Sequence, residues 1–235
     1  MRILGLIPAR GGSKGVPRKN IKILGTKPLL EYTSEVALGS VFLSKIILSS
    51  DDDEIIKVAK EIGLDVPFKR PYDLAKDSSP TLEVIKHAIN YFKERGEEFD
   101  AVCLLQVTSP FRTIKFLDSA IKKFINKKTD SLVSVIEIPH EYNPHWAFEK
   151  DNKGNLKIAT GEQNIISRRQ DLPKAYHRDG SIYLTKTEVI EKLNSLYGNS
   201  ISYIVSPKEN YVNIDTISDW EKAEKLLKLK IKNDI

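Results

Sequence analysis

Residues 2–20 decide the fold of this chain and read Arg2-Ile3-Leu4-Gly5-Leu6-Ile7-Pro8-Ala9-Arg10-Gly11-Gly12-Ser13-Lys14-Gly15-Val16-Pro17-Arg18-Lys19-Asn20. Residues 2–8 form a short apolar run, which is typical of a buried strand. The run passes directly into a loop with three glycines, Gly11, Gly12 and Gly15. Glycine lets a backbone bend and approach a ligand closely. The stretch therefore predicts a buried strand that ends in an open loop.

The loop also carries four basic side chains with no carboxylate between them: Arg10, Lys14, Arg18 and Lys19. Backbone N–H groups together with fixed positive charge suit a polyphosphate. The loop is neither a P-loop, because Gly-Lys-Ser/Thr is absent, nor a dinucleotide fingerprint, because its glycines are wrongly spaced. Pro17 and Pro28 argue against a helix directly after the glycines. We expect a nucleoside triphosphate as the ligand, and a flexible basic surface loop is the alternative.

Composition indicates one globular domain covering residues 1–235. Of the 235 residues, 40% are hydrophobic and 29% are charged. No apolar run approaches the roughly 20 residues that cross a bilayer, and the N-terminus does not resemble a signal peptide. The single cysteine, Cys103, stands in an apolar run, so we interpret it as a core residue rather than a nucleophile. We therefore expect a cytoplasmic protein that is not bound to a membrane.

The net charge of +5 raises the question of nucleic-acid binding. Much of the basic excess lies in the glycine loop and in residues 225–232, where Lys alternates with Leu and Ile at helical spacing. A solvated helix face accounts for that tail, and the chain has no nucleic-acid motif. We expect no nucleic-acid partner.

Apolar runs alternate with helical patterns along the chain. The runs lie at residues 2–8, 45–49, 64–68, 99–107, 131–136, 181–185 and 202–205, and the helical patterns at 28–38, 51–62, 80–95, 113–124, 188–196 and 217–230. This alternation predicts an α/β fold with a Rossmann-like, mostly parallel sheet and helices on both faces. Ligands of such sheets bind beyond the carboxyl ends of the strands, where the glycine loop stands.

Residues 139–178 interrupt this alternation. They include Asn143-Pro144-His145-Trp146 and a turn predicted at residues 151–155, and they lack long apolar runs. We interpret them as an insertion that serves either as a lid or as an arm that reaches a second subunit.

Residues 7–20 resemble the signature loop of the CMP-sialic acid synthetases, or acylneuraminate cytidylyltransferases. Three later segments, at residues 104–112, 168–183 and 212–216, resemble family segments in the same order. The resemblance implies a nucleotide-diphospho-sugar transferase fold, a homodimer, and CTP and a sugar acid as substrates. It also implies that the nucleotide is bound by Ala9, Arg10, Gly11, Gly12, Ser13, Lys14, Lys19, Asn20 and Arg70.

Arg70 precedes Pro71, which favours extended backbone at the arginine and lets its guanidinium project from a strand end. Cytosine offers adjacent O2 and N3 acceptors that suit this planar fork of donors. The resemblance assigns Arg70 to the base. A surface arginine in a turn is the alternative.

The second matching segment has Val107 where the family usually has proline. A glutamine and two hydroxyls at a strand end can hold a polyhydroxylated sugar without adding charge. The resemblance places Gln106 against the sugar, whereas for Thr108 and Ser109 we favour a role in capping the next helix.

The third segment supplies Arg169, His177 and Asp179 as sugar-binding candidates. An arginine can bind the sugar carboxylate through two parallel hydrogen bonds or bind the leaving pyrophosphate, and Arg169 fits the family's arginine best. His177 could act as a base, although a lone histidine beside a tyrosine is more often structural. The family commonly has asparagine where this chain has Asp179, which bears on the identity of the sugar.

Asn213 and Asp215 alternate onto one face of an extended segment before the last helix pattern. Related enzymes carry Asp-x-Asp there and hold Mg²⁺ with it. Asp215 is therefore our main metal ligand and Asn213 a weaker one, because an amide oxygen carries no charge. The alternative for Asp215 is the N-cap of the helix.

The resemblance thus implies a cytidylyltransferase that makes a CMP-activated nine-carbon 2-keto-3-deoxy sugar acid of the sialic, legionaminic or pseudaminic type. Arg10, Lys19 and Asp215 are its expected catalytic residues, with Mg²⁺ as the cofactor. Two alternatives stay open: a synthetase for an eight-carbon sugar acid, and a CTP-binding module without turnover.

Overall fold

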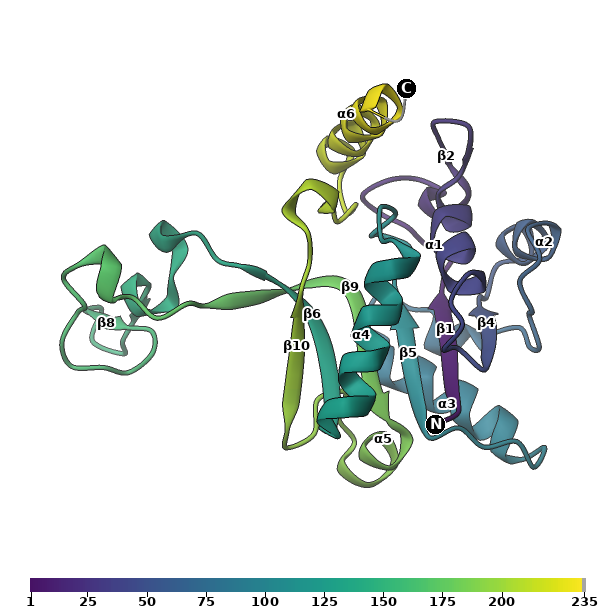
Figure 1. The fold of residues 1–235 in the computed structure, drawn as a ribbon, viewed down its shortest axis with the longest axis horizontal. Helices are drawn as coiled ribbons and strands as arrows, with labels where there is room; N and C mark the ends of the chain where they lie inside the picture. Colours follow the sequence, from purple (N-terminus) through teal and green to yellow (C-terminus); the bar gives the residue numbers. More distant parts are fainter. Residues whose placement is uncertain (234–235) are drawn as a thin grey trace.

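Six strands form the central sheet of the computed structural model, which describes residues 1–233. Their order across the sheet is β10-β6-β9-β5-β1-β4 (Figure 1). The strands are β1 (Ile3–Pro8), β4 (Lys45–Ser49), β5 (Ala101–Leu105), β6 (Ser131–Glu137), β9 (Tyr176–Lys186) and β10 (Ile201–Val205). Two small antiparallel sheets pair β2 (Ile23–Leu24) with β3 (Lys27–Pro28) and β7 (Phe148–Lys150) with β8 (Leu156–Ile158).

The sheet is mostly parallel, as predicted. β1 pairs in parallel with both β4 and β5, and β10 pairs in parallel with β6. β9 is the exception, because it runs antiparallel to its neighbours β5 and β6. It also begins at Tyr176, five residues before the predicted start, where the chain returns to the sheet from residues 139–175. A strand that enters at the carboxyl edge of its neighbours must run against them.

Helices cover both faces of the sheet, which confirms the prediction. The helices are α1 (Leu29–Leu38), α2 (Asp53–Glu61), α3 (Thr81–Lys93), α4 (Ile114–Lys127), α5 (Thr187–Leu193) and α6 (Ile217–Asn233). One core joins α1, α2, α4 and α6 to the face that presents Ile3 and Ile7 of β1. The second core joins α3 and α5 to the opposite face, where Leu4 and Leu6 lie. Strand alternation therefore sorts a continuous apolar run into two cores.

Local sequence signals set several element ends. The Asp52 carboxylate accepts hydrogen bonds from the N–H groups of Glu54 and Ile55 and so caps α2.

Residues 64–68 do not form the predicted strand: only one isolated bridge joins Asp65 to Ile47. Val66, Pro67 and Phe68 follow that bridge, and Pro67 has no N–H to extend a ladder.

The stretch predicted as an insertion projects away from the sheet as an arm, to the left of the body in Figure 1. It leaves through β6 and returns through β9. The predicted turn at residues 151–155 is present and joins β7 to β8, with Asp151 accepting from the N–H groups of Lys153 and Asn155. Gly154 takes a φ of 86°, which explains its place in the turn.

Cys103 is completely buried in β5, as predicted. Burial raises the pKa of its thiol to about 12, so the thiol is protonated and unreactive at neutral pH. Among the residues that the structure describes, no helix combines the length and the apolar character needed to cross a membrane.

Candidate functional site

A cavity of about 400 Å³ opens at the carboxyl ends of β1, β4 and β5. The loop after β1, the segments after β4 and β5, and the residues before α6 enclose it. Its lining brings together eight residues singled out from the sequence: Arg10, Ser13, Lys14, Lys19, Asn20, Arg70, Gln106 and Asp215. The predicted phosphate, base, sugar and metal residues thus meet around one space.

The glycine loop is fixed at both ends by hydrogen bonds. The Ala9 N–H donates to the Ser49 carbonyl of β4 at 3.0 Å. Asn20 is buried and donates from Nδ2 to the Arg10 carbonyl at 2.9 Å, which closes the loop. Between them, the Gly11 N–H donates to the Asp51 carboxylate, while Gly12 has open space around its Cα.

Arg18 lies apart from the other cations of the loop. Its guanidinium contacts Asp52 at 2.6 Å and also pairs with Glu54. The pKa of Asp52 is lowered, chiefly by its hydrogen bond with Arg18. Arg18 therefore ties the loop to the start of α2 and does not face the cavity.

Lys19 joins the loop to a segment at the other end of the chain. Its Nζ donates to the Ile214 carbonyl at 2.6 Å and lies 3.4 Å from Asp215 Oδ1. Only 13% of the Lys19 side chain is exposed. Gly15 packs against the same segment, because a Cβ at Gly15 would lie 1.9 Å from the Asp215 carbonyl oxygen. Glycine is therefore required where the two segments touch.

Asp215 does not cap α6. Thr216 and Asp219 exchange hydrogen bonds, with Asp219 Oδ2 accepting from the Thr216 N–H and hydroxyl and Thr216 Oγ1 accepting from the Asp219 N–H. This arrangement is a capping box. It lowers the pKa of Asp219 to about 2, mainly through the Thr216 hydroxyl. The Asp215 carboxylate stays available to the cavity, with 62% of its side chain exposed.

Asp215 and Asn213 could contribute two oxygens to Mg²⁺. Asn213 donates from Nδ2 to Asp215 Oδ2 at 2.5 Å, and its own Oδ1 is buried without a hydrogen-bond partner among the described residues. Within that part of the chain, no three His, Cys, Asp or Glu side chains are grouped to hold a metal. Mg²⁺ often takes one or two protein ligands and completes its shell with substrate phosphates and water. The donor set fits a metal of that kind.

Arg70 is buried against Ser49, the last residue of β4. It donates from Nε to Ser49 Oγ at 3.0 Å and from Nη2 to the Ser49 carbonyl. Nη1 is the guanidinium nitrogen left without a partner in the described structure. Burial lowers the Arg70 pKa to about 10, so the side chain remains charged at neutral pH. An anchored fork with one free nitrogen can recognise an acceptor without moving.

Gln106 lies directly after β5 and faces the cavity. Its Oε1 lies 3.5 Å from Thr108 Oγ1. The prediction that Thr108 and Ser109 cap the next helix is wrong, because Thr113 accepts from the Phe116 N–H and caps α4. Thr108 instead lines the cavity, and the Ser109 hydroxyl is buried.

Three predicted sugar-binding residues lie outside this cavity. Arg169 is on the arm and lines a separate cavity of about 410 Å³. His177 is exposed near the start of β9, with its ring 6.2 Å from that of Tyr211. Asp179 is buried and accepts from the hydroxyls of Ser134 and Ser206 and from the Ser181 N–H. In this structure its carboxylate joins β6, β9 and the residue after β10.

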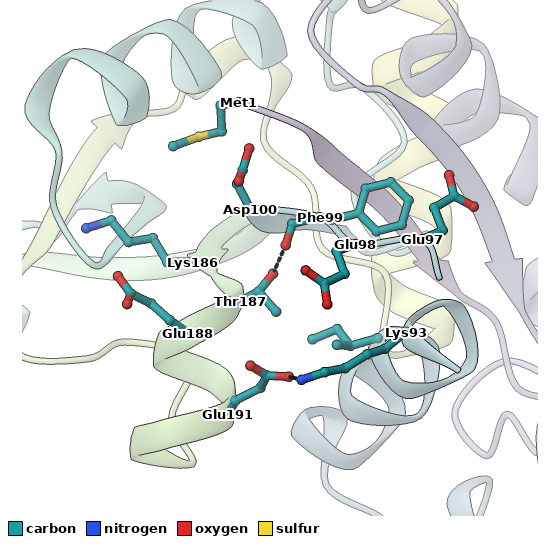
Figure 2. Close-up of a pocket in the computed structure, with 11 residues that line it drawn as sticks. Met1, Lys93, Glu97, Glu98, Phe99, Asp100, Lys186, Thr187, Glu188 and Glu191 are labelled. Atoms are coloured by element: carbon teal, nitrogen blue, oxygen red, sulfur yellow. Dashed lines mark hydrogen bonds and ion pairs between the residues drawn. The ribbon is translucent and has the colours of Figure 1, made fainter. Parts of the chain in front are cut away.

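A third cavity, of about 570 Å³, lies at the opposite edge of the sheet, near Met1 and Lys186 (Figure 2). Acidic side chains dominate its rim, and Glu191 pairs with Lys93 across it (Figure 2). It lies at the amino ends of β1 and β5 and has neither the glycine loop nor a surplus of cations. Of these two cavities, the one at the glycine loop is therefore the one that favours a polyphosphate.

Asp77 pairs with Arg10 and Lys14 at the cavity but was not predicted from the sequence. Lys76, Ser79 and Thr81 line the same space and were not predicted either. Lys76, Asp77 and Ser79 stand in the irregular connection between α2 and α3, and Thr81 is the first residue of α3. No hydrophobic period fixes the direction of a side chain in that connection. The available signal was Arg70, which stands in the same connection and was already predicted to bind the nucleotide.

Known proteins and one family model are similar to this chain over nearly its whole length. A family model described as cytidylyltransferase matches residues 4–231. A pseudaminic acid cytidylyltransferase of Campylobacter jejuni is 37% identical over 229 residues, which is 97% of either chain. A CMP-N,N'-diacetyllegionaminic acid synthase of Legionella pneumophila is 36% identical over 231 residues, again 97% of either chain.

Solved structures agree on the fold. A CMP:2-keto-3-deoxy-manno-octonic acid synthetase complexed with CTP superposes with a TM-score of 0.72 at 14% identity, covering 98% of this chain and all of the other. At that identity the similarity concerns the fold alone.

Proposed function

The chain belongs to the cytidylyltransferase family, and from this premise we propose that it transfers CMP from CTP to a nine-carbon 2-keto-3-deoxy sugar acid. The acceptor is of the pseudaminic, legionaminic or sialic type, and pyrophosphate is released. The observation that carries the proposal is the meeting of Arg10, Lys19 and Asp215 around one cavity. The pseudaminic and legionaminic relatives support a nine-carbon acceptor, whereas the similarity to the eight-carbon synthetase rests on fold alone.

The reaction forms one bond to phosphorus and breaks another. The anomeric oxygen of the sugar attacks the α-phosphorus of CTP, its proton passes to solvent, and the bond from that phosphorus to the pyrophosphate oxygen breaks with inversion. Arg10 and Lys19 stabilise the negative charge that gathers on the phosphate oxygens, and Lys14 binds the triphosphate. Lys19 is well placed for this task because the Ile214 carbonyl already holds its ammonium at the cavity. Loop N–H groups, including that of Gly12, complete the anion site.

Arg70 and Gln106 orient the two substrates in this proposal. The free Nη1 of Arg70 donates to cytosine, while the other two guanidinium nitrogens hold Ser49. Gln106 binds the sugar from the end of β5 without adding charge to an anionic acceptor. This division keeps the base beside β4 and the sugar beside β5, with the phosphates between them.

We further propose Mg²⁺ as the cofactor, held by Asp215 and Asn213. When bound, the ion would neutralise phosphate charge in the transition state. Because Asp215 is the one carboxylate of this pair, metal binding depends largely on the triphosphate oxygens.

The proposed transfer is tested by pyrophosphate release from purified protein with Mg²⁺, each of four nucleoside triphosphates and a panel of sugar acids. We expect release with CTP and a nine-carbon 2-keto-3-deoxy acid, and little with UTP, ATP or GTP. Release with an eight-carbon acid alone would replace the proposed acceptor. CTP binding without release for any acid would indicate a binding module.

The Asp215→Ala variant tests the metal site. We expect kcat to fall about a hundredfold, with a smaller change in the Kd of CTP, because the charge contact matters most in the transition state. The matched control is Asp219→Ala, which removes a carboxylate from the same segment. It should cost about 1 kcal/mol of stability through the lost cap and leave the Mg²⁺ dependence unchanged. Near-parent turnover of Asp215→Ala at saturating Mg²⁺ would mean that the metal is held elsewhere.

We propose that the chain works in the cytoplasm as a homodimer, joined through the arm. Exposed apolar side chains, including Phe148, Leu156 and Ile165, lie on the arm, and such side chains need a partner surface. Arg169 and His177 do not line the cavity of their own chain, and in this proposal they approach the sugar site of the partner. Light scattering at micromolar concentration should give twice the chain mass, and a monomer mass would contradict the dimer.

A further inference from the structure

Asp77 contacts two cations of the glycine loop at once. Its Oδ1 lies 2.6 Å from Arg10 Nη1, and its Oδ2 pairs with Lys14 Nζ. Among the described residues, Asp77 supplies the carboxylate that pairs with these two cations. Two oxygens placed between an arginine and a lysine reproduce the contacts that two oxygens of one phosphate group would make.

The segment that carries Asp77 lies at the rim of the cavity. It follows Arg70 and contains the short 3-10 helix Tyr72–Leu74 and then irregular backbone up to α3. Lys76, Asp77 and Ser79 line the same cavity as Arg10 and Lys14. The carboxylate therefore lies inside the space proposed for the triphosphate.

The contact contributes little to holding the fold together. The Asp77 side chain is 44% exposed and that of Lys14 is 81% exposed, and ion pairs this exposed add little to stability. The pKa of Asp77 is lowered, first by Lys14 and then by Arg10, so the group is ionised at neutral pH. Asp77 adds little stability but contacts Arg10 and Lys14, the two cations proposed to bind phosphate. A role in ligand binding explains this position better than a role in stability.

We propose that the Asp77 carboxylate occupies, in the free protein, the position of a nucleotide phosphate group, and that the triphosphate displaces it. This inference rests on the proposed function. A carboxylate and a phosphate cannot share Arg10 and Lys14 without repulsion, so Asp77 competes with CTP before transfer and with pyrophosphate afterwards. Asp77 thereby weakens the binding of both and favours release of the product.

The test is calorimetric titration of inorganic pyrophosphate into the parent protein and three variants. Asp77→Asn removes the competing charge and should bind pyrophosphate about tenfold more tightly. Asp77→Glu keeps the charge and should bind like the parent. The matched control is Asp53→Asn, which removes an exposed carboxylate paired with Lys69 away from the cavity, and its affinity should not change.

Turnover supplies a second readout. Pyrophosphate should inhibit Asp77→Asn at about tenfold lower concentration than the parent. Equal or weaker pyrophosphate binding by Asp77→Asn, with a parent that binds and turns over, would overturn this inference and leave the proposed function standing. Equal tightening in Asp53→Asn would also overturn it, because net charge would then be the cause. A parent that neither binds pyrophosphate nor releases it from CTP would overturn both.

Discussion

The site depends on one contact between distant parts of the chain, that of the glycine loop with residues 214–215. Lys19 donates to the Ile214 carbonyl across 195 residues of sequence, and Gly15 lies against the Asp215 carbonyl. The loop follows β1, near one edge of the sheet, whereas Asp215 precedes α6. Without this contact, nothing would hold the segment of the proposed phosphate-binding cations against the segment of the proposed metal ligand. With it, they can act on the same triphosphate.

The cations of the loop are held in place before any ligand arrives. Arg18 is fixed by Asp52 and Glu54, and Arg10 and Lys14 meet at Asp77. Preformed contacts of this kind orient donors in advance, so less reorganisation is needed when substrate binds. The same contacts carry a cost where the partner is anionic, because a phosphate must displace it. We therefore infer two effects of the contact with Asp77: it orients the cations of the loop, and it favours release of the product.

Much of the fold follows from patterns in the sequence. Apolar runs alternating with helical periods indicate a parallel sheet with two covered faces, and the loop after residues 2–8 identifies the edge of the sheet where the candidate site opens. The direction of β9 could not be predicted, because residues 181–185 carry the same apolar signal in either direction. It depends on where the arm returns to the sheet.

The site was predictable where a residue directly follows a strand, as with Gln106, or stands within the glycine loop. Asp77 could not be found in this way, because its position depends on the path of an irregular connection. The buried role of Asp179 was also hidden, since its partners Ser134 and Ser206 come from two other strands or their ends. Residues of this kind are fixed by tertiary contacts that no local spacing encodes.

The contact between the loop and residue 215 is tested most directly by Gly15→Ala. Its Cβ would meet the Asp215 carbonyl, so the two segments must separate. We expect a loss of about 1–3 kcal/mol in the free energy of unfolding and at least about a tenfold fall in kcat. Gly12→Ala, whose Cβ meets nothing within 4 Å, should keep the unfolding free energy of the parent. Parent-like stability and kcat in Gly15→Ala would contradict the account.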